Sequence, residues 1–278
     1  MSPTSVPSRM FRLATRLSRS PLHPPLAWLS TRLSRYMDVA QNANNCDFAS
    51  NGEGYLMARG APHWKVALDL GANLGDWALT VNSLAPGCTV HCFEPSPRTV
   101  RTLRANLAGR ENLFVHHLGV GDREGVLAFH DYGDGSVASS FLSREGSTGE
   151  RAEQVVDVPI STLDAFLDAR AGLTVDYAKI DTEGYEMPIL RGAQRSLSSR
   201  RIRALQFEYG GTWLDAGESL RNASRLFADL RWTLYRLLPD GLSPLRYDHR
   251  RDETFKYSNY VAVGDPTVLD AWGIKVFA

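Results

Sequence analysis

The stretch that decides the fold is VALDLGANLGDW, at residues 66–77. Its apolar run around Asp69 is typical of a buried strand, and Gly71 and Gly75 form a turn before an expected helix. In a doubly wound α/β sheet, a nucleotide-like ligand lies at the carboxyl end of the first strand, where glycines let the backbone approach it closely. The stretch therefore predicts a ligand-binding turn at the end of a central strand.

Short apolar runs alternate with helical stretches on both sides of this turn, which predicts right-handed βαβ units and a mostly parallel sheet covered on both faces. A polar loop without a helix, 239–254, joins the last two strands and predicts an antiparallel hairpin at the end of the sheet. The expected strands are 65–70, 88–93, 112–118, 126–130, 155–158, 175–181, 203–208, 232–237 and 257–263, and the expected helices are 76–84, 97–107, 161–169, 186–198 and 217–230.

The residues of the turn suit one class of ligand better than another. A dinucleotide site has the spacing GxGxxG, with the pyrophosphate on a helix N-terminus, whereas Asn73 stands here in place of the second glycine. Asp69 and Asn73 are poor neighbours for a pyrophosphate but good ones for an ammonium group. Glu94 follows the next strand, where a carboxylate can accept hydrogen bonds from both hydroxyls of a ribose. An amino-acid head, a ribose and no phosphate favour S-adenosylmethionine.

A second motif, YAKIDTEGYE at residues 177–186, places Asp181 at the end of another strand. Glu208 ends the strand after it, so the two side chains are expected over one cleft if their strands are neighbours. Such a pair could accept a proton, bind substrate or hold a divalent cation such as Mg²⁺, and the metal is not predicted. Glu183 and Glu186 also fit as acidic groups in the first turn of a helix.

The charge of the 278-residue chain is unevenly distributed, although Lys plus Arg and Asp plus Glu both number 31. Six arginines and no acidic residue precede Asp38, so residues 1–37 carry a formal +6 and the neutral total leaves −6 for the rest. We expect a basic helical arm at residues 1–50, divided at Ser20-Pro21, and one α/β domain at residues 51–278. Pro24-Pro25 is expected to end any earlier helix.

The arm has several interpretations. Met10, Leu13, Ala14 and Leu17 recur at helical spacing, which predicts an amphipathic helix. It could pack on the body, mediate a homodimer, cover the site as a lid, tether the chain to a membrane surface or serve as a transit peptide. No apolar run reaches the 18 to 20 residues of a membrane span.

Cysteine usage and net charge restrict the setting and the partners. Cys46, Cys88 and Cys92 form neither a disulfide framework nor a zinc motif, and no secretion signal is evident, so we expect a cytoplasmic protein. An acidic body repels phosphate, which argues against nucleic-acid binding. The Gly- and Ser-rich stretch 131–151 is expected as a long functional loop beside the strand ends.

Taken together, VALDLGANLGDW, the following FEP and KIDTEGYE closely resemble the FkbM-type family of class I S-adenosylmethionine-dependent methyltransferases. The resemblance runs from about Asn51 to Val263, and it includes NGEGY at 51–55, STLD at 161–164, ILRGA at 189–193 and NYVAV at 259–263. It implies a Rossmann-like, seven-stranded sheet and methyl transfer to a hydroxyl of a sugar or other natural-product scaffold. The residues expected to bind the cofactor are Glu53, Asp69, Gly71, Ala72, Asn73, Gly75, Glu94, Pro95, Ser96, Asp122 and Asp181.

A hydroxyl is weakly acidic, so an oxygen acceptor needs a general base as it attacks the methyl carbon. The expected catalytic residues are Asp181, Glu208 and His249, with His130 as a further candidate. His116 and His117 are interpreted as structural.

Three other functions were weighed against methyl transfer to a small molecule. A nicotinamide-dependent oxidoreductase shares the fold but needs the glycine that Asn73 replaces. A non-catalytic protein would not need to keep Asp69, Gly71, Glu94 and Asp181 together. A nucleic-acid methyltransferase would be expected to show a Pro-Cys nucleophile or a (D/N)PP(Y/F/W) loop, and the sequence contains neither.

Overall fold

A computed structural model describes residues 8–21, 23–144 and 151–277. The chain divides into two compact units, Met1–Asn44 and Asn45–Ala278. The first contains α1 (Ser8–Leu17) and α2 (His23–Ala40), the two expected helices of the arm. No earlier helix runs into Pro24-Pro25, as expected, because α1 ends at Leu17; both prolines lie in the first turn of α2, where a missing N–H is tolerated. No helix in the described ranges is both long and apolar enough to cross a membrane.

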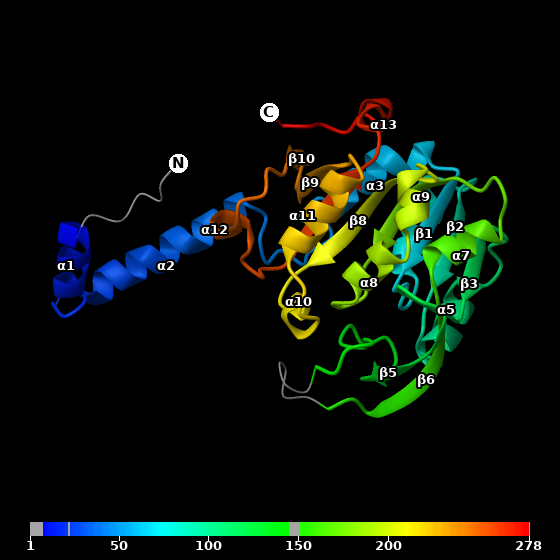
Figure 1. The fold of residues 1–278 in the computed structure, drawn as a ribbon, viewed down its shortest axis with the longest axis horizontal. Helices are drawn as coiled ribbons and strands as arrows, with labels where there is room; N and C mark the ends of the chain where they lie inside the picture. The colour runs from blue at the N-terminus through cyan, green and yellow to red at the C-terminus, as the bar shows by residue number, and fades with distance from the viewer. Residues whose placement is uncertain (1–7, 22, 145–150, 278) are drawn as a thin grey trace. The chain divides into compact units, whose positions relative to one another are not determined.

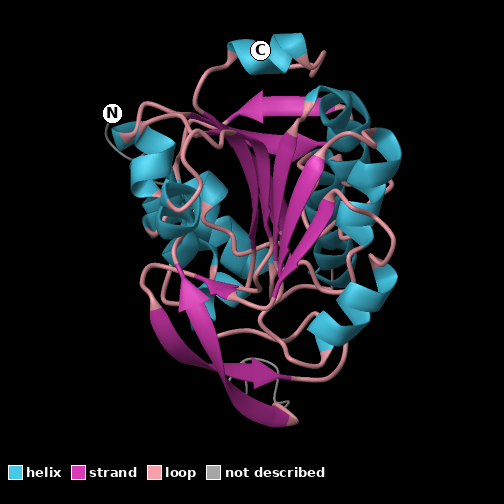
Figure 2. Ribbon diagram, turned by 90° about the vertical axis from the view of Figure 1, so that its right-hand side faces the viewer, coloured by secondary structure: helices cyan, strands magenta, loops and turns pink. Residues whose placement is uncertain are grey.

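The second unit is built on a large, mostly parallel sheet with helices on both sides (Figure 2). The strand order is β10-β9-β11-β8-β7-β1-β2-β3, and β11 runs antiparallel to both of its neighbours. This is the doubly wound, Rossmann-like fold that the sequence predicts. The strands are β1 (Val66–Leu70), β2 (Thr89–Phe93), β3 (Leu113–His116), β7 (Val175–Ile180), β8 (Ile202–Tyr209), β9 (Thr233–Leu238), β10 (Gly241–Pro244) and β11 (Ser258–Val263).

The sheet has eight strands in place of the expected seven, because part of the expected loop 239–254 forms β10. The antiparallel pairing of β9 with β11 is confirmed, but β11 lies inside the sheet and β10 forms its edge. The same loop also contains α12 (His249–Asp252). The sequence of β10, GLSP, has a glycine and a proline in four residues, and proline is tolerated only at an edge. Its pattern therefore resembles a turn.

The strands expected at 126–130 and 155–158 belong to a separate sheet of order β4-β6-β5 (Figure 1). These strands are β4 (Gly119–Val120), β5 (Gly125–Asp131) and β6 (Gln154–Ser161), and β5 and β6 pair antiparallel. The described part of the expected long loop follows β5, and Ser140 pairs with His130 on that strand. Residues 145–150 of the loop lie outside the described part of the chain.

Helices cover both faces of the large sheet and enclose two cores. Leu68 and Leu70 point into one core and Ala67 into the other, as expected for alternating side chains of a strand. The expected helix 186–198 is two helices, and between them Gly192 lies so close to the carbonyl of Gly121 that a Cβ would collide with it. The body's helices are α3 (Glu53–Gly60), η1 (Ala61–His63), α4 (Asp76–Leu84), α5 (Thr99–Asn106), α7 (Leu163–Asp168), α8 (Glu186–Arg191), α9 (Gln194–Ser198), α10 (Thr212–Asp215), α11 (Leu220–Asp229), α12 and α13 (Thr267–Ala271).

Candidate active site

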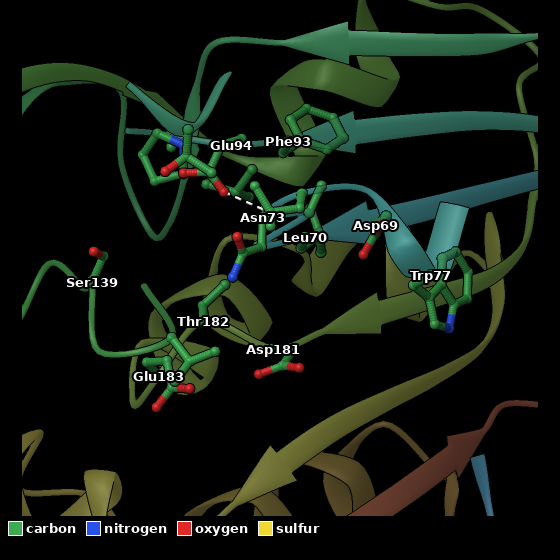
Figure 3. A pocket seen from close by; sticks show the side chains of 18 of the residues that line it. Asp69, Leu70, Asn73, Trp77, Phe93, Glu94, Ser139, Asp181, Thr182 and Glu183 are labelled. Atoms are coloured by element: carbon green, nitrogen blue, oxygen red, sulfur yellow. Dashed lines mark hydrogen bonds between the residues drawn. The ribbon is translucent and has the colours of Figure 1, made fainter. Parts of the chain in front are cut away.

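A cavity of about 330 Å³ lies at the carboxyl ends of β1, β2 and β7. The turn after β1 forms one wall, and the end of β7 brings Asp181, Thr182 and Glu183 to another (Figure 3). The small sheet and the loop after it complete the lining. This is the place where a doubly wound sheet binds its ligand.

The turn after β1 is shaped by its glycines. Gly71 has a φ of +83° and lies so close to the carbonyl oxygen of Asp181 that a Cβ would sit 1.9 Å from it. The amides of Gly71 and Ala72 both donate to the carbonyl of Phe93 on β2. Gly75 also has a positive φ, but it packs on Leu103 of α5 and does not line the cavity. The two glycines thus hold the turn against the end of β7 and against α5.

Asp69 is the group in this cavity that most clearly lacks a partner. Its side chain is 1% exposed, and neither carboxylate oxygen has a hydrogen bond of ordinary geometry with the described residues. Burial raises the pKa of Asp69 to about 6, although Lys179 beside it acts to lower it. An unpaired buried carboxylate is unfavourable, so this site is suited to a cationic ligand group with N–H donors.

Glu94 extends from the end of β2 and is held in place by two amides. Its Oε2 accepts from the N–H of Asn73 at 2.9 Å, and its Oε1 accepts from the N–H of Ser96 at 2.8 Å. Burial raises the pKa of Glu94 to about 7, against the effect of these two donors. Each oxygen keeps further acceptor capacity, which suits a pair of ligand hydroxyls. Pro95 lines the cavity, whereas Ser96 is buried behind Glu94.

Asp181 and Glu208 do meet, as predicted from their positions at the ends of neighbouring strands β7 and β8. Burial acts to raise the pKa of Asp181, but Lys179 Nζ at 2.6 Å and a hydrogen bond with Glu208 hold it below its usual value. Burial and the charge of Asp181 raise the pKa of Glu208 well above its usual value. The surroundings thus shift the two pKa values in opposite directions, so that a proton is favoured on Glu208 over Asp181.

Glu183 adds a third carboxylate, on a turn where its φ is +55°. Burial and the charge of Asp181 raise the pKa of Glu183 to about 8, while Arg144, 3.1 Å away, acts in the opposite direction. One oxygen from each of Asp181, Glu183 and Glu208 lies within 4.8 Å of the others. Carboxylate oxygens are the ligands that hard divalent cations prefer, so the residues for such a site are present.

Glu53 lies behind the cavity wall, at the start of α3. Its Oε1 accepts from Gln206 Nε2 at 2.7 Å, and its Oε2 accepts from Asn51 Nδ2 at 2.7 Å. Its charge acts on the pKa values of both Asp69 and Lys179. The structure thus gives Glu53 a place beside the site but not in its lining.

The structure does not bring three other candidates to the cavity. His249 is exposed on α12, and the cavity lining contains no residue of that helix. Asp122 is exposed on a turn beside Gly192, two residues past the stretch Leu118–Val120 that does line the cavity. His130 lies on β5 with its backbone paired to Ser140, and it does not line the cavity either. A sequence position near a strand end does not specify the direction of a side chain.

Sequence reasoning missed the apolar and hydroxyl groups that close the cavity. Phe129 of β5 and Phe141 of the following loop contact each other, with ring centroids 5.1 Å apart. The Gly- and Ser-rich composition of 131–151 was the available signal, and Gly135–Val137, Ser139 and Phe141 from that loop line the cavity. Lys179 and Thr182, inside the KIDTEGYE motif, also line it.

The comparison with protein-family models identifies one family. The model of the methyltransferase FkbM domain matches residues 69–238. Over 163 residues the chain is 29% identical to the 2-O-methyltransferase NoeI of Sinorhizobium fredii (55% of this chain, 66% of that protein). Over 81 residues it is 40% identical to the 31-O-demethyl-FK506 methyltransferase FkbM of Streptomyces tacrolimicus (27% and 30%). The chain thus spans less than two thirds of the length of either relative. A crystal structure of a methyltransferase FkbM from Methylobacillus flagellatus is similar with a TM-score of 0.44 and 15% identity (71% of this chain, 43% of that chain).

Proposed function

The chain belongs to the FkbM family of methyltransferases, and we propose that it transfers a methyl group from S-adenosylmethionine to a hydroxyl of a small molecule. The observation that carries the proposal is that one cavity contains both Glu94 and a buried Asp69 whose carboxylate oxygens have no hydrogen bond of ordinary geometry with the described residues. Two relatives are named as O-methyltransferases, which supports an oxygen acceptor. We propose a sugar or another natural-product scaffold as the acceptor.

The residues present fit S-adenosylmethionine. Asp69 would accept hydrogen bonds from the ammonium group, and Glu94 would accept them from the ribose hydroxyls. Gly71 lines the cavity, and its lack of a side chain lets the turn pack against the carbonyl of Asp181. When bound, S-adenosylmethionine would supply a methyl group carried on a sulfonium sulfur. As the acceptor oxygen bonds in line to the methyl carbon, the carbon–sulfur bond would break and leave the sulfur neutral.

Asp181 is the proposed general base. Lys179 keeps it ionised, so it can take the proton of the acceptor hydroxyl as the new carbon–oxygen bond forms. Glu208, whose pKa is raised, would donate a hydrogen bond to Asp181 and help to hold it in place. Phe129 and Phe141 add apolar walls to the same cavity.

A divalent cation is a second way to activate the hydroxyl, favoured by the three carboxylates at Asp181, Glu183 and Glu208. Treatment with a chelator distinguishes activation by a metal from general-base catalysis by Asp181. Loss of turnover that Mg²⁺ restores would assign the cluster to a metal, whereas unchanged turnover would leave Asp181 acting without one.

Calorimetric titration tests the donor site. We expect binding of S-adenosylmethionine and its demethylated product but not of NAD, and Asp69→Asn should weaken binding about tenfold or more. Asp122→Asn makes the same chemical change outside the cavity and should leave binding unchanged. Binding of NAD alone would refute the assignment. Binding without turnover on a broad panel of hydroxylated acceptors would instead favour a non-catalytic protein.

A further inference from the structure

The two helices of the arm each present an uncovered apolar face within their own unit. On α1, Leu13 and Leu17 lie one helical turn apart, and Leu13 is 58% exposed. Arg12 and Arg16, also one turn apart, occupy the neighbouring face and are exposed. α1 therefore combines an apolar face with a purely basic flank.

α2 carries a longer apolar stripe, and none of its residues is buried. The helical period places five large apolar side chains along one side of it. On a different side of α2, Trp28 is 60% exposed, and the guanidinium of Arg32, which lies between Trp28 and the stripe, is 4.9 Å from the centre of its ring. The stripe consists of Leu26, Leu29, Leu33, Tyr36 and Met37, all of them exposed.

The charge of the arm decides between the surfaces that could cover these faces. Six arginines precede its first acidic residue, so pairing with the arm of a second copy would bring two sets of like charges together. An anionic bilayer satisfies both properties, because basic side chains bind its headgroups while apolar ones enter the acyl boundary. We propose that α1 and α2 lie in the surface of a membrane that contains anionic lipid and tether the methyltransferase body there.

Sedimentation of the full chain with vesicles tests this proposal. We expect binding to phosphatidylcholine vesicles that contain 30% phosphatidylglycerol, about tenfold or more weaker binding to phosphatidylcholine alone, and release by 0.5 M NaCl. Arg12→Glu with Arg16→Glu should weaken binding by at least about 25-fold, at roughly fivefold per arginine removed. Arg104→Glu with Arg123→Glu makes the same change in net charge on exposed positions of the body and should have little effect.

Trp28 provides a second readout, because the other five tryptophans are buried. Insertion should shift its fluorescence to shorter wavelength and protect it from acrylamide, and Trp28→Phe should remove that response without preventing sedimentation. Leu29→Ser with Leu33→Ser should abolish binding at physiological salt.

Two results would overturn the proposal. In one, the protein does not bind anionic vesicles but forms a dimer in solution, and Leu29→Ser with Leu33→Ser returns it to a monomer. That result would assign the stripe to contact with a second copy. In the other, the protein neither binds vesicles nor self-associates, and the serine variants lower its thermal midpoint, which would assign the stripe to packing within one chain.

Discussion

Lys179 lies on β7 beside Asp69 in the strand register, and its ammonium contacts Asp181 two residues later. Although burial acts to lower it, the carboxylates of Asp181, Asp69 and Glu53 raise the pKa of Lys179 well above its usual value. A single cation therefore stabilises both the carboxylate proposed for the donor and the one proposed for the acceptor. Its removal should affect the two functions together.

We expect Lys179→Met to raise the pKa of Asp181, because the attraction that favours its ionised form is lost. Activity that needs ionised Asp181 rises with pH through this pKa, so the acidic limb of the rate profile should move up by about one pH unit or more. Turnover at neutral pH should fall roughly tenfold, and Lys179→Arg should restore part of it. A profile that keeps its shape while only thermal stability falls would contradict this role.

A second pair of titratable residues lies away from the cavity. His91 Nδ1 and His116 Nε2 are 3.1 Å apart between β2 and β3, and both rings contact Phe166. Burial lowers the pKa of both histidines to about 4, with a further contribution from the charge of Arg170. The lowered pKa values show neither a catalytic nor a binding role for the two histidines. They predict that the free energy of unfolding depends on pH.

Between pH 6.5 and 4 the unfolded chain binds protons at these histidines that the folded protein does not, so stability should fall as pH falls through this window. His91→Phe with His116→Phe should remove about 1–2 kcal/mol of the loss between pH 7 and pH 5, after allowance for partial solvent exposure. Urea unfolding at both pH values measures this. If the variant and the original protein lose the same free energy of unfolding between pH 7 and pH 5, the two histidines are not the cause of the pH dependence.

At the scale of elements, Asp131 joins the small sheet to the turn after β2. It is fully buried at the end of β5 and accepts hydrogen bonds from Ser96 Oγ, Arg98 and Gln154. Ser96 in turn donates its N–H to Glu94. The small sheet therefore supports the proposed ribose-binding carboxylate through two hydrogen-bonded residues.

Asp131→Asn should lower the free energy of unfolding by about 1–3 kcal/mol, because Arg98 and its neighbours lose a buried charged acceptor. We also expect weaker binding of S-adenosylmethionine, measured by calorimetry alongside thermal unfolding. Asp134→Asn changes an exposed residue of the same loop and serves as the control. If the variant is less stable but keeps its affinity for S-adenosylmethionine, the small sheet does not support the donor site.

Elements differ in how well the sequence predicts them. The glycine turn and the strand-end acids Asp69, Glu94 and Asp181 are local features of strand, turn and helix, and the structure brings them to one cavity. The placement of Lys179 beside Asp69 depends on the pairing of β1 with β7, which no local pattern reveals. The small sheet and β10 also depend on pairing between distant or very short segments, which is why they were missed.

At the scale of the whole molecule, every residue that lines the cavity belongs to the second unit. A chain that begins at Asn45 should therefore bind S-adenosylmethionine within about twofold of the full chain, because no donor-site contact is removed. Vesicle sedimentation of the same truncated chain should be lost. A large fall in donor affinity would instead make the arm part of the site.

The close approach of Gly71 to the Asp181 carbonyl has a consequence for engineering and for divergence. The turn proposed to hold the donor and the turn proposed to carry the base meet backbone to backbone, so any side chain added at Gly71 would displace both. The loop after β5 borders the same cavity without taking part in that contact. New acceptor preferences should therefore be obtainable by exchanging residues 135–141, while the machinery on the large sheet is inherited unchanged.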